Sequence, residues 1–238
     1  MALYAIGDLH LSFSSGKDMD VFGRNWANHE EKIRKNWNRL IGPEDTCVIM
    51  GDLSWAKKID EMSEDLAYVL SLPGRKILLR GNHDMFWEAN KTPALNRRFE
   101  GQLEFLQNNF YVYKSPVTGT EYALVGTKGY TYEGKDTIEH AEKLVKREYD
   151  RLKISYEAAV AAGYSRFLCF LHYPPTNIYQ DDSLFTQLAE EYHTEQVIYA
   201  HCHGFMRFHD SYRGMHHHVR YSLASADCLN FRPMKVVD

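Results

Sequence analysis

Short polar clusters at the ends of apolar runs are the residues of this chain best suited to chemistry. Five occur in order: Asp8-Leu9-His10, Gly51-Asp52, Gly81-Asn82-His83-Asp84, His172 and His201-Cys202-His203. They supply carboxylate, amide and imidazole groups, a donor mixture that binds a pair of transition-metal ions. Any one cluster alone is better explained by a turn, a helix cap or a hydrogen-bonded histidine. All five in series favour a metal site.

The apolar runs that precede these clusters are predicted to be buried strands. Short apolar runs bounded by Gly or Asp are typical of strands in an α/β sheet. The runs are Leu3–Ile6, Thr46–Met50, Lys76–Leu79, Tyr122–Val125, Phe167–Leu171 and Val197–Tyr199. Because ligands in α/β folds bind beyond the carboxyl ends of the strands, we expect the clusters to meet there. In extended backbone Asp8 and His10 would point the same way and face one metal.

Apolar residues at helical spacing fill the intervals between the strands. They predict helices at Asn25–Leu40, Asp60–Leu72, Thr137–Ala162 and Ser183–Tyr192. Hairpin-like runs interrupt the β-α-β alternation after about residue 110 and again after about residue 205, which favours two mixed sheets over one doubly wound sheet. The expected class is therefore α/β (α+β). With 238 residues and no linker rich in Pro, Gly or Ser, we expect one domain over residues 1–238.

Composition limits the partners that this chain is expected to have. The net charge of −4 argues against an extended nucleic-acid track, although it leaves room for a local basic patch. No apolar stretch approaches the ~20 residues that span a bilayer, so no membrane partner is expected. The N-terminus lacks the basic region of a signal peptide, and the four scattered cysteines fit a reducing cytoplasm. The oligomeric state is left open.

The ordered motifs D-x-H, G-D, G-N-H-D, a lone H and H-x-H resemble those of the calcineurin-like metallophosphoesterase superfamily, over Asp8 to His203. The resemblance implies a four-layer sandwich of two mixed β-sheets flanked by helices, the metallo-dependent phosphatase-like fold, with a dinuclear metal centre. Matched by motif, the ligands of one metal would be Asp8, His10, Asp52 and His203. The ligands of the other would be Asp52 as a bridge, Asn82, His172 and His201.

The resemblance also implies the reaction, hydrolysis of a phosphomonoester or phosphodiester in a small phosphorylated substrate. Two divalent transition-metal ions would activate a shared water, and the resulting hydroxide would attack phosphorus in line. His83 matches the superfamily's non-ligand histidine and would donate a proton to the leaving oxygen. Mixed nitrogen and oxygen donors suit Mn, Fe, Zn or Ni, among which the sequence does not choose. Asp84 could orient a neighbour or cap a turn, and Arg80 is a candidate phosphate contact.

The second motif departs from two branches of the superfamily. Protein Ser/Thr phosphatases continue it as G-D-x-x-D-R-G, whereas Leu53-Ser54-Trp55-Ala56 follows Asp52 here, so that both the acid and the arginine are missing. Trp55 also stands where the repair nucleases have a histidine. A nuclease or cyclic-nucleotide phosphodiesterase remains an alternative. A non-catalytic scaffold is a further one, disfavoured because every expected ligand position is filled.

Aromatic residues and a long loop border the expected site. Trp55 and Trp87 follow ligand-bearing loops and could line an aromatic mouth, whereas Trp26 is expected in the core. The loop Leu11–Gly23 is long enough to act as a lid. The run His216-His217-His218 is expected to be part of a strand, in which only alternate residues share a face. It is assigned no catalytic role.

Overall fold

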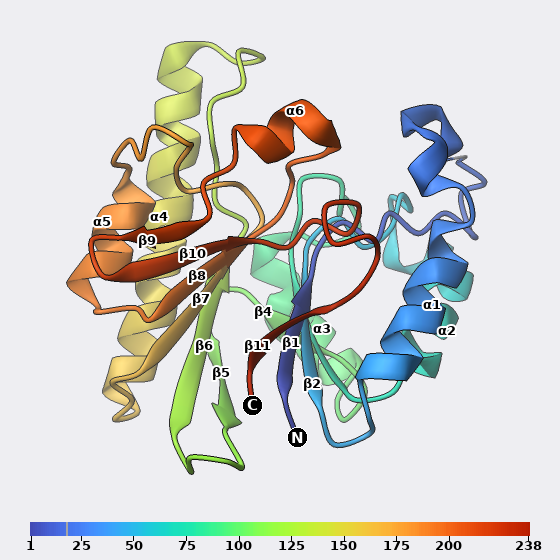
Figure 1. Cartoon of the computed structure of the whole chain (residues 1–238), viewed down its shortest axis with the longest axis horizontal. Helices are drawn as coiled ribbons and strands as arrows, with labels where there is room; N and C mark the ends of the chain where they lie inside the picture. Colours follow the sequence, from blue (N-terminus) through green and yellow to red (C-terminus); the bar gives the residue numbers. More distant parts are fainter. Residues whose placement is uncertain (18) are drawn as a thin grey trace.

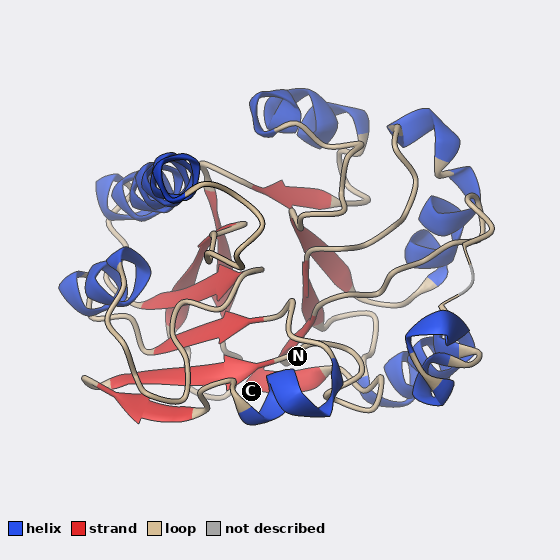
Figure 2. Cartoon of the chain, turned by 90° about the horizontal axis from the view of Figure 1, so that it is seen from above, coloured by secondary structure: helices blue, strands red, loops and turns tan. Residues whose placement is uncertain are grey.

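The computed structural model describes residues 1–17 and 19–238 and places two β-sheets face to face between layers of helices (Figure 1). Seen from above, the sheets form the centre and the helices flank them on both sides (Figure 2). The layers therefore run helix, sheet, sheet, helix. This arrangement confirms the predicted α/β class and the four-layer sandwich.

The first sheet has five strands in the order β11-β1-β2-β3-β4. Their bounds are β1 Leu3–Ile6, β2 Thr46–Met50, β3 Arg75–Leu79, β4 Glu104–Leu106 and β11 Met234–Val237. β1 to β4 run parallel, and β11 pairs antiparallel with β1. β1 and β2 are buried along their whole length, as expected of parallel strands covered on both faces.

The second sheet has six strands in the order β5-β6-β7-β8-β10-β9. Their bounds are β5 Phe110–Lys114, β6 Glu121–Thr127, β7 Phe167–Leu171, β8 Gln196–Tyr199, β9 Gly214–His216 and β10 Val219–Leu223. The four central strands are parallel, whereas β5 and β9 pair antiparallel at the two edges. Both sheets are thus mixed, as the hairpin-like runs predicted.

The helices divide between the two outer faces. Those against the first sheet are α1 His29–Leu40, α2 Ser63–Ser71 and α3 Thr92–Arg98, and those against the second are α4 Ile138–Ala161 and α5 Leu184–Glu191. A short helix, α6 Gly204–His209, follows β8. No helix in the part of the chain that the structure describes is both long and apolar enough to cross a membrane.

Two predicted helices begin later than expected. The turn Arg24–Trp26 is a 3-10 helix, and Asn28 then adopts a left-handed φ of 51°, so that α1 starts at His29. A second 3-10 turn, Ile59–Glu61, delays α2 to Ser63. By contrast, α5 begins at the predicted place, with Ser183 as its N-cap. The Ser183 hydroxyl accepts N–H groups of the first turn in a capping box.

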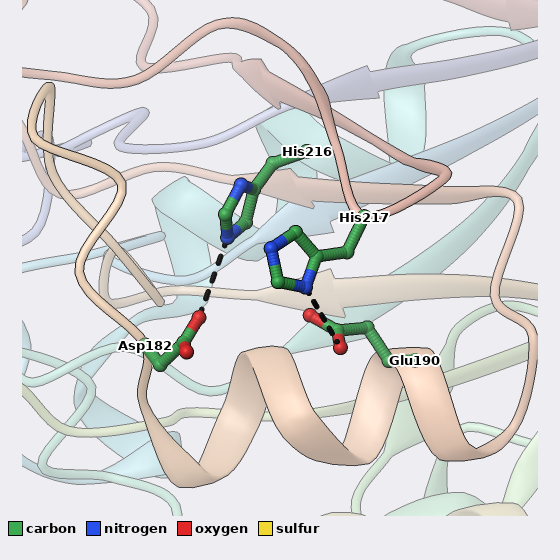
Figure 3. Close-up of side chains that lie close together, drawn as sticks. All are labelled: Asp182, Glu190, His216 and His217. Atoms are coloured by element: carbon green, nitrogen blue, oxygen red, sulfur yellow. Dashed lines mark hydrogen bonds and ion pairs between the residues drawn. The ribbon is translucent and has the colours of Figure 1, made fainter.

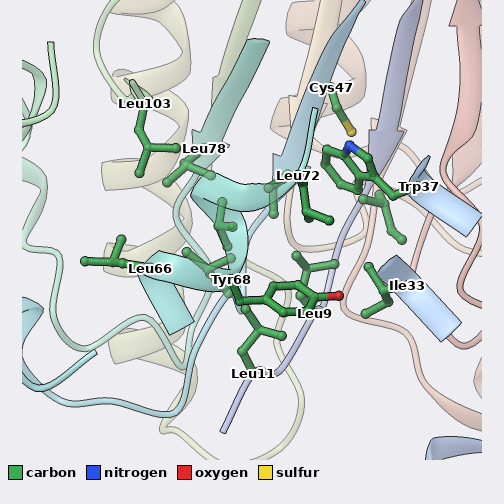
Figure 4. Packing of buried hydrophobic residues seen from close by; sticks show 14 of the residues in the cluster. Leu9, Leu11, Ile33, Trp37, Cys47, Leu66, Tyr68, Leu72, Leu78 and Leu103 are labelled. Atoms are coloured by element: carbon green, nitrogen blue, oxygen red, sulfur yellow. The ribbon is translucent and has the colours of Figure 1, made fainter. Parts of the chain in front are cut away.

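Alternating side chains of the strands build three large cores among the described residues, one between the sheets and one between each sheet and its helices. Leu3 and Ala5 of β1 face the other sheet, whereas Tyr4 and Ile6 face the helices, as the two-residue period requires. Figure 4 shows part of the helix-side core, where Ile33 and Trp37 of α1 lie near Tyr68 and Leu72. Fully burying each large apolar side chain contributes roughly 1.5–3 kcal/mol. This packing holds the strand ends in place.

The histidine run is a strand only at its first residue. β9 ends at His216, and His217 and His218 form the turn to β10 with φ values of 45° and 68°. The prediction of strand for the whole run is therefore wrong, because the chain reverses immediately to pair β10 with β9.

Candidate metal centre

Four of the seven predicted ligands have left-handed backbone. The φ values are 60° for Asp8, 45° for His10, 51° for Asp52 and 70° for His201. Such conformations are uncommon outside glycine and cluster at functional sites, where the surrounding fold must impose them. The reasoning that extended backbone would align Asp8 with His10 is therefore wrong, although the two side chains do lie in one cluster.

Two glycines let the loops after β2 and β3 touch beneath this region. A Cβ on Gly81 would lie 2.1 Å from Asp52 Oδ1 and 2.2 Å from the Asp52 nitrogen. A Cβ on Gly51 would lie 2.6 Å from the Gly81 Cα and 2.6 Å from His172 Nδ1. Only glycine permits this approach, and it places the Asp52 carboxylate beside the loop that carries Asn82.

The first cluster contains Asp8, His10 and His203. The Nε2 atoms of His10 and His203 are 3.4 Å apart, and His203 Nε2 lies 3.5 Å from Asp8 Oδ1. Asp8 Oδ1 is buried and accepts no hydrogen bond from the described residues, which is costly for a carboxylate oxygen unless a cation lies beside it. The cluster offers one carboxylate and two imidazoles to such a cation.

The second cluster contains Asp52, His172 and His201, with Asn82 beside them. His172 Nε2 lies 2.7 Å from Asn82 Oδ1, 3.2 Å from His201 Nδ1 and 3.5 Å from Asp52 Oδ2. The structure thus brings all seven predicted ligands together in two groups, and which ion each residue would hold stays a prediction.

Hydrogen bonds on the far side of the rings indicate which ring nitrogens carry lone pairs. His172 Nδ1 donates to the Met50 carbonyl at 3.0 Å, and His201 Nε2 donates to Glu133 Oε1 at 2.9 Å. In the neutral rings, His172 Nε2 and His201 Nδ1 are then acceptors. His172 Nε2 faces both His201 Nδ1 and the acceptor Oδ1 of Asn82. Acceptors converging without a proton between them fit a divalent cation, bound through nitrogen and oxygen donors.

Asp52 connects the two clusters. Its Oδ2 lies 3.8 Å from His10 Nε2 in the first cluster and 3.5 Å from His172 Nε2 in the second. Its Oδ1 accepts the His83 N–H at 2.8 Å, which fixes the plane of the carboxylate. Burial, followed by the negative charge of Asp8, raises the pKa of Asp52 to about 7. Cations bound between these carboxylates would relieve their repulsion.

Asp84 holds the loops that carry Asp52 and Asn82. Its carboxylate is buried and accepts the backbone N–H groups of Asp52, Leu53 and Gly81 at 2.7–2.8 Å. Of the two roles considered for Asp84, the structure shows that it orients its neighbours. It does so through backbone groups.

Two carboxylates that the sequence did not single out position histidines of the clusters. Asp227 Oδ1 accepts from His203 Nδ1 at 2.9 Å, and Glu133, which also binds Arg207 at 2.6 Å, accepts from His201. Although burial alone would lower it, the charges of Asp8 and Asp227 raise the pKa of His203 to about 11. The environment therefore favours positive charge at this histidine, where a metal ion would displace the proton.

A cavity of about 450 Å³ opens beside the first cluster. The lining includes His10, His83 and His203 of the motifs together with Lys17, Met19, Phe22, Asn25, Trp26 and Trp55. The Trp55 ring stacks on His10 at 5.0 Å and packs against His83 at 4.3 Å, measured between ring centroids. Burial first, then electrostatic interaction with the neighbouring His172 and Lys17, lowers the pKa of His83 to about 4.

Of the predictions for the other two tryptophans, the one for Trp26 is confirmed and the one for Trp87 is wrong. Trp87 does not line the mouth of the site. It is 1% exposed, packs edge-on against Phe105 and donates its indole N–H to Thr92. Trp26 is in the core as expected, yet its edge also contacts His10 at a centroid distance of 5.8 Å.

Arg80 and the loop Leu11–Gly23 are the residues predicted to face substrate. Arg80 is half-buried beside the charges of Asp84 and Glu148. Among the described residues, those that line the 450 Å³ cavity do not include Arg80. Its contact with phosphate stays a prediction. The loop contributes Lys17, Met19 and Phe22 to the cavity wall, whereas Asp18 lies outside the described residues.

The chain belongs to the calcineurin-like phosphoesterase family, whose model matches residues 1–205. The Gene 66 protein of Mycobacterium phage D29 is 28% identical over 138 residues, which are 56% of this chain and 65% of the phage protein. An uncharacterised protein of Methanocaldococcus jannaschii is 32% identical over 89 residues, 36% of this chain and 48% of that protein. The matched segments thus span less than two thirds of either relative.

Solved structures share the fold at low sequence identity. The phosphopantetheinyl hydrolase of Mycobacterium tuberculosis superposes with a TM-score of 0.57 at 16% identity, covering 99% of this chain and 95% of that chain. A protein of Thermus thermophilus gives a TM-score of 0.50 at 11% identity, covering 99% of this chain and 97% of that chain. These similarities agree with the fold that the family implies.

Proposed function

We propose that this chain is a metal-dependent phosphoesterase. The observation that carries the proposal is the position of Asp52 Oδ2, 3.8 Å from a histidine of one cluster and 3.5 Å from a histidine of the other. One carboxylate oxygen between two groups of nitrogen and oxygen donors is suited to bridge two cations. Membership of the calcineurin-like phosphoesterase family supports the same chemistry.

We assign the metal ligands as the motifs and the geometry suggest. One cation would be held by Asp8, His10, Asp52 and His203, and the other by Asp52, Asn82, His172 and His201. The donor set suits Mn, Fe, Zn or Ni. When bound, such a pair offsets charge on phosphoryl oxygens and lowers the pKa of a water, which makes nucleophilic oxygen available near neutral pH.

The protein's own residues prepare the site for that chemistry. Asp84 and the two glycines fix Asp52, while Asp227 and Glu133 set the rings of His203 and His201. Preorganised ligands of this kind need no reorganisation during the reaction.

His83 is proposed to protonate the leaving oxygen. It lines the cavity and its ring centroid lies 5.8 Å from that of His10, so a phosphoryl group held at the first cluster would be beside it. Its pKa of about 4 leaves the ring neutral at neutral pH before substrate binds. A bound phosphate ester brings negative charge next to the ring, which favours the protonated form that donates.

The cavity indicates a small substrate with an apolar or aromatic part. Its walls carry Trp26, Trp55, Met19 and Phe22, and Lys17 Nζ lies 2.9 Å from the centroid of the Trp55 ring. Lys17 is available for an anionic group, while the rings suit a planar or apolar one. We further propose that residues 1–238 act as one domain, because both sheets supply ligands and share the core between them.

A substrate panel tests the proposal. Chelator-treated protein is reloaded separately with Mn, Fe, Zn or Ni and assayed on a phosphomonoester, a bis-ester and single-stranded DNA. Turnover of a small ester in at least one metal form is expected, with loss in Asp52→Asn. His83→Ala should lose turnover while it keeps its metal content, and His140→Ala, an exposed histidine of α4, should behave as wild type.

The panel also separates the alternatives. Preference for the DNA would indicate a nuclease, and preference for the bis-ester a phosphodiesterase. Two bound metal ions without turnover of any substrate would overturn the catalytic proposal in favour of a scaffold.

A further inference from the structure

A second region of the described chain gathers histidines and carboxylates at the edge of the second sheet, in a group that shares no residue with the metal motifs (Figure 3). His216 ends β9 and His217 begins the turn to β10, while Asp182 precedes α5 and Glu190 lies in its last turn. One ligand atom of each residue lies within 4.8 Å of the others. The four therefore surround one small volume.

Two of the spacings between these atoms match those of a tetrahedral metal site. His216 Nε2 lies 3.3 Å from Asp182 Oδ1, and His217 Nδ1 lies 3.2 Å from Glu190 Oε2 (Figure 3). Four donors at about 2.0–2.1 Å from a tetrahedral zinc ion are about 3.3–3.4 Å from one another. The two imidazole rings also lie side by side, with centroids 4.0 Å apart, so both present nitrogen to the same space.

The second oxygen of Glu190 gives an independent indication. Glu190 Oε1 is buried and has no hydrogen-bond partner among the described residues. The Glu190 side chain is 29% exposed, but its Oε1 atom is shielded from solvent, and an ionised carboxylate oxygen without a partner is costly unless its charge is compensated. A hydrogen bond from His217 reaches only Oε2, whereas a cation held by the carboxylate would compensate the charge of both oxygens.

We propose that Asp182, Glu190, His216 and His217 form a further divalent-metal site, separate from the phosphoesterase centre. Two imidazoles and two carboxylates suit Zn²⁺, which binds both donor types and prefers four ligands in a tetrahedral arrangement. The ion would tie the edge hairpin β9-β10 to α5, two elements that these side chains connect. Edge strands need such protection, because their free backbone groups can pair with other chains.

The site is independent of the proposed reaction. None of its four residues belongs to the two clusters around Asp52. Its occupancy should therefore change without loss of phosphoesterase activity, and it would remain measurable even if that activity were absent.

Zinc counting tests the inference. Wild-type protein and the double variant His216→Gln with His217→Gln are stripped with chelator, dialysed against a fixed free Zn²⁺ concentration and analysed by mass spectrometry of the metal. We expect the double variant to bind one Zn²⁺ per chain fewer than wild type. The matched control is His218→Gln, which lies in the same left-handed turn but outside the cluster and should bind as wild type does.

A second pair of substitutions separates metal binding from simple hydrogen bonding. Asp182→Asn with Glu190→Gln keeps side-chain oxygens that accept from histidine but removes both charges. We expect this variant also to lose one Zn²⁺, and Co²⁺-substituted protein to lose a tetrahedral absorption band. Circular dichroism and thermal unfolding establish that each variant is folded. Equal zinc content in wild type and both folded double variants would overturn the site.

Discussion

Asp227 Oδ1 lies 2.9 Å from His203 Nδ1, so a carboxylate after β10 fixes the ring of a candidate ligand after β8. The same carboxylate accepts the N–H groups of Gly204 and Cys228, which holds it in place. In the same way, Glu133 Oε1 accepts a hydrogen bond from His201 Nε2 at 2.9 Å. Each cluster thus has a histidine whose orientation and basicity depend on a carboxylate outside the motifs.

Removing Asp227 should weaken metal binding without removing a ligand. In Asp227→Ala, His203 loses its acceptor and its fixed tautomer, so we expect metal affinity to fall by about 10–100-fold. Asp227→Asn keeps an acceptor oxygen and should fall less. Competition with a metal-sensitive dye measures the change, with Asp150→Ala, an exposed acid of α4, as control. Unchanged affinity in both Asp227 variants would show that this contact does not support a metal ligand.

Glu133 should act on the second cluster in the same way. Because its carboxylate binds both His201 and Arg207, its pKa is held below the usual range and it stays ionised. Glu133→Ala should lower the affinity for one of the two metal ions by about 10-fold or more and leave the other in place. Metal content measured at limiting metal should show that stepwise loss. Simultaneous loss of both ions would instead mean that the clusters are occupied as a unit.

Much of this arrangement was predictable, for a physical reason. Parallel strands of one sheet end at the same edge, so the order of the motifs could group the ligands after β1, β2 and β3 and, separately, those after β7 and β8. That the two groups face each other depends on how the two sheets pack, which motif order does not give. Asp227 could have been noticed, since it also follows a strand, but nothing marked its partner. It reaches His203 because β10, which precedes Asp227, pairs parallel with β8, which precedes His203, and spacing along the chain does not encode that pairing.

Other features could not have been predicted from local pattern. Glu133 lies in a loop with no motif, and its position depends on the Arg207 pair across from it. Trp87 follows the GNHD motif closely, yet the chain turns inward at Asp84 and buries it. The left-handed φ values of Asp8 and His10 likewise arise from the loops' hydrogen bonds to Gly51 and Asp52, which the sequence of one segment cannot reveal.

The close approach of Gly81 to Asp52 makes a sharp prediction. A Cβ at Gly81 would overlap the Asp52 carboxylate and backbone nitrogen, so Gly81→Ala must displace the Asp52 carboxylate. We expect a loss of about 1–3 kcal/mol in unfolding free energy, together with loss of bound metal. Chemical denaturation and metal analysis measure the two effects. Gly42→Ala is the matched control, because its Cβ would meet only Asp45 Oδ2 at an ordinary 3.6 Å.

Asp84 should matter to the centre without touching metal. Its carboxylate accepts three backbone N–H groups from the loops of Asp52 and Gly81, and Asp84→Ala would leave these donors buried. Each unsatisfied buried donor costs about 1–3 kcal/mol, so marked destabilisation is expected in denaturant. If Asp84→Ala unfolds at the same denaturant concentration as wild type, water must replace the carboxylate.

Trp55 provides the most direct test of how substrate is held. Its ring stacks on His10, packs against His83 and contacts the Lys17 ammonium, so it forms a wall of the cavity beside the candidate proton donor. Trp55→Ala should raise KM for an ester with an aromatic leaving group more than for a small aliphatic ester, whereas Trp55→Phe should restore much of the difference because it keeps a ring. Trp87→Phe is the matched control, since Trp87 is buried away from the cavity and its replacement should lower thermal stability without changing KM. Steady-state kinetics on the two esters decide the matter: an equal change in KM for both in Trp55→Ala would mean that Trp55 supports the histidines and does not contact substrate.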